Sequence, residues 1–334
     1  MAFRLAVYGY DTDIGKLVFE TLDEEESFVD MIYPLSVFEG EYDAVSVKGQ
    51  NYLVTPITTF DFSKADVLLL LCPKDESIRW IDKAREQGCF VIDNSNLYSG
   101  TADAVTLSPS VNPFDMKKAL ALKLGIPPLA STVALCHVLK VLDDEYEIIR
   151  CNVVALESFS EHGEVGTKTL VNETMQLLNG MAPDHEGFKA QCAFNLHSYI
   201  GDLDDDGLST HEHVIKTEVE TLLGVFKDGF SVTAVQVPVI YGHTLCCTVD
   251  FNDSVSVDSI REILNNEEQV TVKEPDEAFS PVENIVNERK IVVSRIRRES
   301  LSGKRYSFTV MIDNTRIGEA YVLVELLRLF RKNQ

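Results

Sequence analysis

An uninterrupted apolar run at residues 67–72 (VLLLLC) restricts the possible folds more than any other feature of this sequence. Such a run is typical of a strand that is buried on both faces, as in a parallel sheet. Strand-like segments at residues 3–8 and 90–92 and helix-like segments at residues 14–22 and 76–87 alternate around it. This alternation predicts a doubly wound parallel sheet.

The segments that follow residue 129 have a different pattern. Longer strand candidates occur there at residues 148–158, 231–240, 244–251, 290–296 and 306–312. A helix is expected at residues 131–142, and a last helix at residues 316–329 is expected to fold back on the first domain. We therefore expect a two-domain α/β protein whose second domain has a mixed, mainly antiparallel sheet with helices on one face.

Composition excludes several classes of partner. Acidic residues outnumber basic ones by 53 to 30, and the net charge of −23 repels nucleic acids and anionic membrane surfaces. No apolar segment approaches the roughly 18–20 residues that span a bilayer, and the first residues lack the layout of a signal peptide. The seven cysteines are scattered without a CxxC pair, which is typical of reduced thiols in a cytoplasmic protein.

A glycine-containing turn follows the first strand and includes Gly9, Thr12 and Gly15. In a G-x-x-G-x-x-G turn, backbone amides and a helix N-terminus hold a pyrophosphate. Here Thr12 occupies the middle glycine position, and Asp11 and Asp13 place carboxylates where phosphate would lie. Two interpretations stay open: a dinucleotide-binding turn, or a turn that only caps the following helix.

An acidic segment at residues 202–207 (DLDDDG) begins like a calcium-binding loop. The glutamate needed at its last ligand position is replaced by His213, and Glu212 precedes it. His211 and His213 point in different directions on a helix, so they cannot share a metal ion there. We interpret the segment as a solvated turn that caps a helix, and the sequence predicts no metal site.

Two further residues have side chains that catalysis can use. Cys136 lies within an apolar helical segment, where a thiol is normally a small buried hydrophobic group. His243 lies where two strand-like segments meet, and a single histidine in a turn is more often structural than catalytic. Neither residue by itself indicates an active site.

Several short motifs occur in the order found in a known family. They are the turn at residues 9–15, VIDNS at 91–95, PSVN at 109–112, AST at 130–132, FN at 194–195, VPV at 237–239 with GH at 242–243, and DN at 313–314. Through them the chain resembles the aspartate-semialdehyde dehydrogenase family over nearly its whole length, and most closely its Usg-like branch of paralogues. The resemblance implies a Rossmann-type NAD(P)-binding domain at residues 1–129 and 313–334, and an α+β dimerisation and catalytic-type domain at residues 130–312.

The chemistry of this family depends on a cysteine thiolate that attacks an aldehyde, a histidine that acts as acid–base catalyst, and hydride transfer to or from NADP. The resemblance places the cysteine at Ala130 and the histidine at His243, so only the histidine is retained. Residues that orient the site or bind phosphate and substrate are also replaced. Their positions fall on Ser160, Ser99, Val214 and Gln236, on Leu129 before the nucleophile, and on His211 or Glu212.

The cofactor positions that the resemblance implies are altered as well. They fall on Gly9, Thr12, Ile14, Gly15, Val37 and Gly318. Val37 replaces the arginine that contacts the 2′-phosphate of NADP, Glu39 adds repulsion, and Val322 replaces an asparagine that contacts the cofactor. Any binding of NAD(P) is therefore expected to be weak.

Because the nucleophile and most substrate- and cofactor-binding residues are replaced, we expect a catalytically inactive homologue that acts as a homodimeric binding or scaffold protein. Two alternatives stay open. The first is an enzyme of altered chemistry that uses His243 with a nucleotide or acyl ligand. The second is residual oxidoreductase activity on aldehydes, as in amino-acid biosynthesis, alone or through pairing with a true dehydrogenase.

Overall fold

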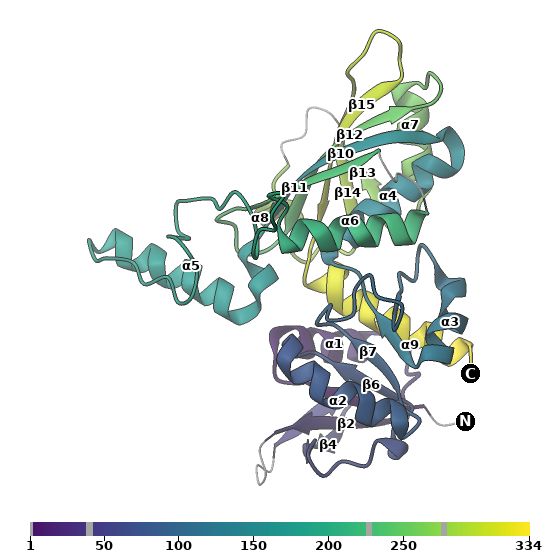
Figure 1. The fold of residues 1–334 in the computed structure, drawn as a ribbon, viewed down its shortest axis with the longest axis vertical. Helices are drawn as coiled ribbons and strands as arrows, with labels where there is room; N and C mark the ends of the chain where they lie inside the picture. The colour runs from purple at the N-terminus through teal and green to yellow at the C-terminus, as the bar shows by residue number, and fades with distance from the viewer. Residues whose placement is uncertain (1–2, 38–42, 225–228, 275–278) are drawn as a thin grey trace. The chain divides into compact units, whose positions relative to one another are not determined.

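The computed structural model describes residues 3–37, 43–224, 229–274 and 279–334, and the chain divides into two compact units (Figure 1). Unit 1 contains Met1–Pro128 and Glu319–Gln334, and unit 2 contains Leu129–Gly318. The expected α/β fold class is confirmed, because unit 1 is built on a parallel sheet and unit 2 on a mixed sheet. No helix within the described ranges combines the length and the apolar character needed to cross a membrane.

Unit 1 is organised around a seven-stranded sheet with the order β5-β2-β1-β6-β7-β9-β8, in which every pairing is parallel. Its strands are β1 (Arg4–Tyr8), β2 (Met31–Ser36), β5 (Thr55–Pro56), β6 (Val67–Leu70), β7 (Phe90–Asp93), β8 (Val105–Thr106) and β9 (Leu124–Ile126), and β3 (Ala44–Val47) and β4 (Gln50–Leu53) form a separate hairpin. Its helices are α1 (Asp13–Glu24), η1 (Phe62–Lys64), α2 (Lys74–Glu86), η2 (Pro113–Asp115), α3 (Met116–Leu122) and α9 (Val322–Lys332).

The apolar run that predicted a doubly covered strand forms β6 inside this sheet. Its residues Val67–Leu70 have no exposed surface, and β1 and β7 pair with it on either side. The helix α9 packs within the same unit through Phe330, whose ring lies 5.0 Å from that of Phe90 and 5.8 Å from that of Phe3, centre to centre. The hydrophobic core of unit 1 therefore contains residues from both the N-terminal and the C-terminal parts of the protein.

Unit 2 is built on a six-stranded sheet with the order β11-β10-β12-β15-β14-β13. Its strands are β10 (Ile148–Glu157), β11 (Phe230–Gln236), β12 (His243–Phe251), β13 (Val270–Val272), β14 (Ile291–Arg298) and β15 (Arg305–Ile312), and its helices are α4 (Ala130–Tyr146), η3 (Phe159–His162), α5 (Gly163–Leu178), α6 (Thr210–Leu223), α7 (Val257–Asn265) and α8 (Pro281–Asn284). The π-helical turn η4 (Arg316–Tyr321) begins in unit 2 and ends in unit 1. The helix α4 contacts both α6 and α7, and all three contact the sheet, whereas α5 extends away from it (Figure 1). The pairings β10–β11 and β13–β14 are parallel, and the others are antiparallel, so the expected mixed sheet is present.

The structure corrects two expected boundaries. The strand expected at residues 231–240 ends at Gln236, because Pro238 has no amide proton to donate and the Val239 amide turns back to Val237 O over 2.7 Å. The helix expected from residue 316 begins with a wider turn, in which the Gly318 amide donates to Asp313 O over 2.9 Å. Consequently the chain returns to unit 1 at Glu319, later than the expected residue 313.

Candidate functional site

The predicted acid–base histidine lies in unit 2, at the place where strand β10 ends and its antiparallel neighbour β12 begins. His243 is the first residue of β12, and Glu157 is the last residue of the neighbouring strand β10. The antiparallel register of β10 and β12 brings these two residues together. The short helix η3 continues directly from β10 and adds Glu161. The side chains of Glu157 and His243 have no exposed surface.

Two glutamates and two histidines converge here, and we call Glu157, Glu161, His211 and His243 the glutamate–histidine cluster. His243 Nε2 lies 2.8 Å from Glu157 Oε2 and 3.1 Å from Glu161 Oε2. His211, in the first turn of α6, places Nε2 at 3.6 Å from Glu157 Oε1 and Nδ1 at 4.0 Å from Glu161 Oε1. One buried imidazole nitrogen therefore faces two carboxylates.

Charges within the cluster shift the pKa values of its members. Burial by itself lowers the pKa of His243, but the carboxylates of Glu157 and then Glu161 outweigh burial and raise this pKa to about 10. Burial by itself raises the pKa of Glu157, but His243 and His211 outweigh burial and hold this pKa well below its usual range. The Glu157 carboxylate is therefore ionised at neutral pH despite its burial.

A polar network holds the other ring nitrogen of His243. The Ser158 amide donates to Nδ1 over 3.1 Å, and Ser158 Oγ lies at the same distance from Nδ1. Asn314 Oδ1 accepts hydrogen bonds from the hydroxyls of Ser158 and Ser160 and from the Gly242 amide, over 3.2, 3.1 and 2.9 Å. Because a backbone amide can only donate, this contact works against the rise in the pKa of His243 that the carboxylates cause, and it favours a ring proton on Nε2 over one on Nδ1.

Ala130, to which the resemblance assigns the nucleophile position, is the first residue of α4 and is 2% exposed. A Cβ atom built on Gly318 would lie 2.4 Å from the Cβ atom of Ala130, so glycine is required opposite it. The hydroxyls of Ser131 and Thr132 are buried and have no hydrogen-bond partner within the described residues. The first turn of α4 thus presents a methyl group and two hydroxyls, but no thiol.

The other predicted substrate positions are divided between the two units. Gln236 Nε2 donates to Glu157 O over 2.8 Å, and Gln236 Oε1 pairs with His162 Nε2 over 2.8 Å. Ser160 belongs to the network around His243. Val214 is half-buried on α6, and Ser99 lies in unit 1. The structure therefore brings Gln236, Ser160 and His243 to the same end of β10.

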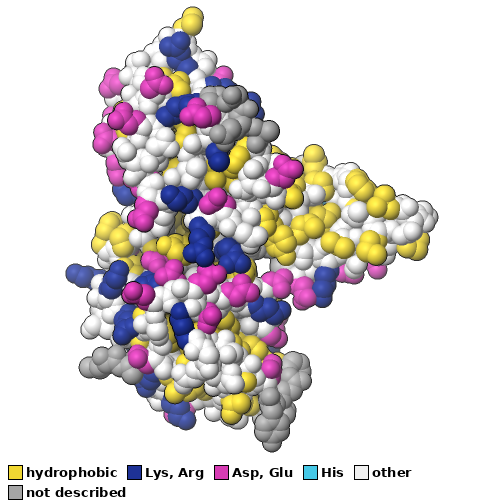
Figure 2. All heavy atoms as spheres, turned by 180° about the vertical axis from the view of Figure 1, so that it is seen from behind, with side chains coloured by type: hydrophobic (Ala, Val, Ile, Leu, Met, Phe, Trp, Pro, Cys, Tyr) yellow, Lys and Arg dark blue, Asp and Glu magenta, His cyan; other side chains and the backbone are white. Residues whose placement is uncertain are grey.

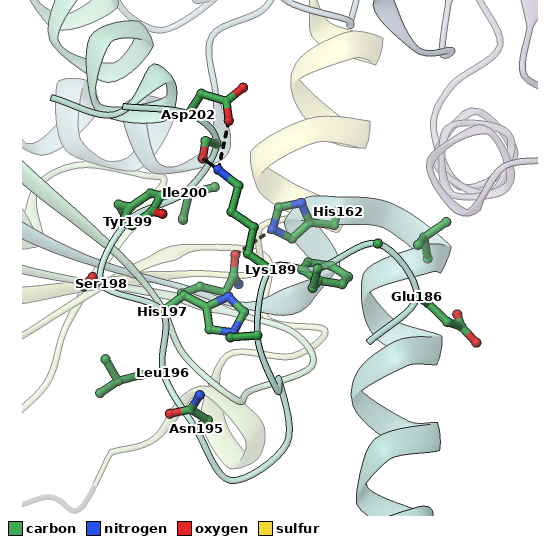
Figure 3. Close-up of a pocket in the computed structure, with 16 residues that line it drawn as sticks. His162, Glu186, Lys189, Asn195, Leu196, His197, Ser198, Tyr199, Ile200 and Asp202 are labelled. Carbon is green, nitrogen blue, oxygen red and sulfur yellow. Dashed lines mark hydrogen bonds and ion pairs between the residues drawn. The ribbon is translucent and has the colours of Figure 1, made fainter. Parts of the chain in front are cut away.

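A pocket of about 640 Å³ opens beside this end of the sheet (Figure 3). Its walls come from the loop that follows α5, together with His162 and Gln236. On one wall, Lys189 Nζ pairs with Asp202 Oδ1 over 2.9 Å (Figure 3). Because Gln236 lines the pocket and also holds the backbone of Glu157, the pocket adjoins the glutamate–histidine cluster.

The glycine turn of unit 1 keeps the shape of a phosphate-binding turn, but its amides are in use. Gly9 has a φ of +89°, and a Cβ atom there would lie 2.2 Å from Leu71 O. Thr12 caps α1, because its Oγ1 accepts from the Gly15 amide over 3.0 Å and its own amide donates to Gly9 O over 3.2 Å. Asp13 adds a negative charge to the first turn of the helix. These residues fit a helix cap and fit a pyrophosphate poorly.

The remaining cofactor positions do not supply a cation. Val37 is 45% exposed, and Glu39 lies outside the described residues. Ile14 lies in the first turn of α1 and is partly exposed. Gly318 belongs to unit 2, where its close contact with Ala130 gives it a packing role.

Sequence reasoning missed two members of the cluster, Glu157 and Glu161, and did not connect His211 with His243. A signal for Glu157 was present in the alternation of β10. Cys151, Val153 and Ala155 face the core, and Glu157 continues the same buried face. A glutamate on the buried face of a strand needs a charged or hydrogen-bonding partner.

Comparison with protein families identifies both units. A model described as "Semialdehyde dehydrogenase, NAD binding domain" matches residues 4–119, and one described as "Semialdehyde dehydrogenase, dimerisation domain" matches residues 139–317. The aspartate-semialdehyde dehydrogenase of Rickettsia conorii is 27% identical over 97% of this chain and 96% of its own length. Aspartate-semialdehyde dehydrogenase 2 of Vibrio cholerae is 26% identical over 98% of this chain and 97% of its own.

Solved structures agree with these matches. The crystal structure of aspartate semialdehyde dehydrogenase II from Vibrio cholerae superposes with a TM-score of 0.94 at 25% identity, and it covers 100% of this chain and 99% of its own. A probable aspartate-semialdehyde dehydrogenase from Pseudomonas aeruginosa has a TM-score of 0.93 at 25% identity, with 100% of both chains covered. The chain belongs to the semialdehyde dehydrogenase family.

Proposed function

We propose that this protein is a catalytically inactive, Usg-like member of the family that acts as a homodimeric binding or scaffold protein. The observation that carries the proposal is Ala130 at the first residue of α4, where the resemblance places the nucleophilic cysteine. A methyl group cannot attack an aldehyde, so the covalent route of the family is closed.

The other cysteines support the proposal, because none is placed to act as a thiolate. Burial raises the pKa of Cys136 well above its ordinary value and raises that of Cys192 to about 12. A reactive cysteine needs the opposite shift. Within the described ranges Cys246 is the exposed cysteine, and it lies on the face of β12 opposite to Leu245 and Cys247, which are buried.

The surface of α5 supports the homodimer. Val171, Met175 and Leu178 follow one another at helical spacing and are 42%, 58% and 74% exposed. Val165, elsewhere on α5, and Met181, just after it, are also exposed, and Figure 2 shows hydrophobic side chains along the projecting part of unit 2. An exposed apolar area of this kind marks a protein interface. The match to a dimerisation domain is consistent with a second copy of this chain as the partner.

An activity assay tests the inactive state. Purified protein is mixed with aspartate semialdehyde, phosphate and NADP, and absorbance at the reduced-nicotinamide band is followed. We expect no turnover above background, because losing a covalent nucleophile typically costs on the order of 10⁶ in turnover. A rate within about tenfold of an ordinary enzyme, roughly 1–10 per second, would contradict the proposal.

A ligand screen tests the binding role. The pocket of about 640 Å³ beside Gln236 is large enough for a small molecule. Nucleotides and amino-acid metabolites are added singly in a thermal-shift panel. A ligand that binds the folded state at 100-fold over its Kd adds about 2.7 kcal/mol to the free energy of unfolding. If no member of the panel raises the melting temperature, the scaffold role is favoured over the binding role.

A second candidate function, an oxidoreductase or an enzyme of altered chemistry, is favoured by one observation. His243 is retained and is oriented by Ser158 and Asn314 through buried hydrogen bonds. The aspartate-semialdehyde dehydrogenases to which the chain is similar give the substrate class for this alternative. The same assay separates the oxidoreductase from the inactive homologue, because the oxidoreductase requires turnover that His243→Ala abolishes, and the ligand panel supplies candidate substrates for an altered chemistry.

A further inference from the structure

We infer that Glu157, Glu161 and His243 form a binding site for one divalent transition-metal ion. Each residue offers one ligand atom, and these atoms lie within 4.8 Å of one another. The inference concerns the glutamate–histidine cluster itself and does not depend on whether the protein is active.

The geometry of the three side chains is close to that of a loaded site. His243 Nε2 is 2.8 Å from Glu157 Oε2 and 3.1 Å from Glu161 Oε2. Bonds of about 2.0–2.2 Å from zinc to nitrogen or oxygen place neighbouring ligand atoms roughly 3–4 Å apart. The side chains therefore need to separate only slightly to admit an ion at their centre.

The hydrogen bonding of Glu157 is incomplete without an additional partner. Its side chain has no exposed surface, and neither carboxylate oxygen accepts a hydrogen bond from the described residues. The Ser158 amide donates to Nδ1 of His243, so Nε2 is the ring nitrogen that offers a proton to the carboxylates, and it offers one. This one proton faces two carboxylates and can be directed at only one oxygen. A bound cation would satisfy both carboxylates at once.

The charges of the glutamate–histidine cluster also favour a bound cation. Within the described chain, the cationic groups that pair with Glu157 and Glu161 are His211 and His243, and no lysine or arginine reaches them. Glu157 and Glu161 thus place two carboxylates side by side, with Glu157 fully buried and Glu161 largely buried. Buried carboxylates are costly without a counter-charge, and one divalent ion can contact both of them.

The donor set selects the class of ion. One imidazole nitrogen with two carboxylates suits Zn²⁺, Mn²⁺, Fe²⁺ or Co²⁺, whereas Ca²⁺ takes six to eight oxygen ligands. When Nε2 binds the ion, the ring proton must lie on Nδ1, where Ser158 Oγ at 3.1 Å can accept it, and the Ser158 amide then gives up its present bond to Nδ1. His211 lies on the other side of Glu157 and can donate to its free Oε1, a positioning role outside the ligands.

Metal titration of the full-length protein tests the site. The protein is treated with chelator, dialysed, and titrated with Co²⁺, whose visible absorption reports ligation, and the bound Co²⁺ is then displaced by Zn²⁺. We expect one ion per chain. Glu161→Gln and His243→Gln should weaken binding at least about 100-fold, since even changes outside the ligands typically cost 10–100-fold. Circular dichroism checks that each variant is folded. Glu161→Gln is the variant expected to keep the fold, because Glu161 is the least buried of the three ligands, with 14% of its side chain exposed.

The acidic turn of unit 2 provides the matched control. His213 Nε2 lies 2.5 Å from Asp204 Oδ2 in an exposed pair, and this is where an ion that bound only adventitiously would be expected. His213→Gln should leave Co²⁺ binding unchanged. The inference fails if the folded wild-type protein takes up no Co²⁺ or Zn²⁺, or if folded Glu161→Gln binds as the wild type does. It also fails if His213→Gln removes the ion.

Discussion

Gly318 packs so closely against Ala130 that a Cβ atom on Gly318 would lie 2.4 Å from the Cβ atom and 3.0 Å from the Cα atom of Ala130. This contact joins the turn that follows β15 to the first turn of α4. It explains the glycine by packing alone. It also means that the position assigned to the nucleophile has little spare volume on this side.

Gly318→Ala is therefore expected to destabilise the protein by about 1–3 kcal/mol, the usual cost of overpacking a well-filled site. Chemical denaturation monitored by circular dichroism measures this loss as a lower midpoint. The double variant Ala130→Gly with Gly318→Ala removes the Cβ atom that clashes, so it should recover part of the loss. Simple addition of the two single effects would show that the two residues are not coupled.

Ala130→Cys is expected not to restore dehydrogenase activity. The new thiol would lie at the N-terminus of α4, but the position that the resemblance assigns to a carboxylate-binding arginine is Gln236, which is occupied with His162 and Glu157 O. Loss of one partner of a buried charge pair typically costs about 2–5 kcal/mol, or roughly 30- to 4,000-fold. Steady NADP reduction by this single variant would show that the assignment of Gln236 is wrong.

Glu173→Gln is expected to destabilise unit 2 by about 1.5–3 kcal/mol, the usual value for hydrogen bonds to a charged group. Its carboxylate is buried and accepts from the Cys192 and Ala193 amides over 2.6 and 2.8 Å and contacts His185 Nδ1 at 2.6 Å. Equilibrium unfolding in urea at neutral pH measures the loss. An unchanged midpoint would contradict a supporting role for this carboxylate.

The stability of the wild-type protein should fall in acid partly through the same group. Burial by itself raises the pKa of Glu173, but His185 and the two amides outweigh it and lower the pKa below its ordinary value. A lowered pKa means that the contribution is complete above the unfolded value of about 4.3 and is lost as the pH falls through the folded value. The wild type should therefore lose more stability than Glu173→Gln as the pH falls below about 4.3 toward the lower pKa of the folded state, and equal losses over this range would exclude the group.

Met175→Glu is expected to convert the proposed homodimer into a monomer, because it places a charge in the middle of the apolar stripe on α5. An unpaired charge buried in an interface typically costs several kcal/mol. Light scattering at micromolar concentration measures the mass. Leu301→Glu is the control, since Leu301 is fully exposed in the turn between β14 and β15. A monomeric wild type would remove the basis of this prediction.

Much of unit 1 followed from local sequence patterns. The run at residues 67–72 predicted the buried strand β6, and the amphipathic segment at residues 76–87 predicted α2. Both predictions were confirmed because burial on two faces, or on one helical face, leaves a period in the sequence itself. Boundaries were less accurate where a tight turn ended an element, as after Gln236, where the Val239 amide bonds back to Val237 O across Pro238.

The sequence by itself determined the fold class and the family of this protein, since apolar periodicity and ordered motifs are local. Only the tertiary structure decided that Glu157 and Glu161 face His243, which lies 82 residues beyond Glu161 in the chain. The antiparallel pairing of β10 with β12 places these side chains together. Carboxylates and imidazoles attract one another through space, and no local pattern records which of them a strand pairing will bring into contact.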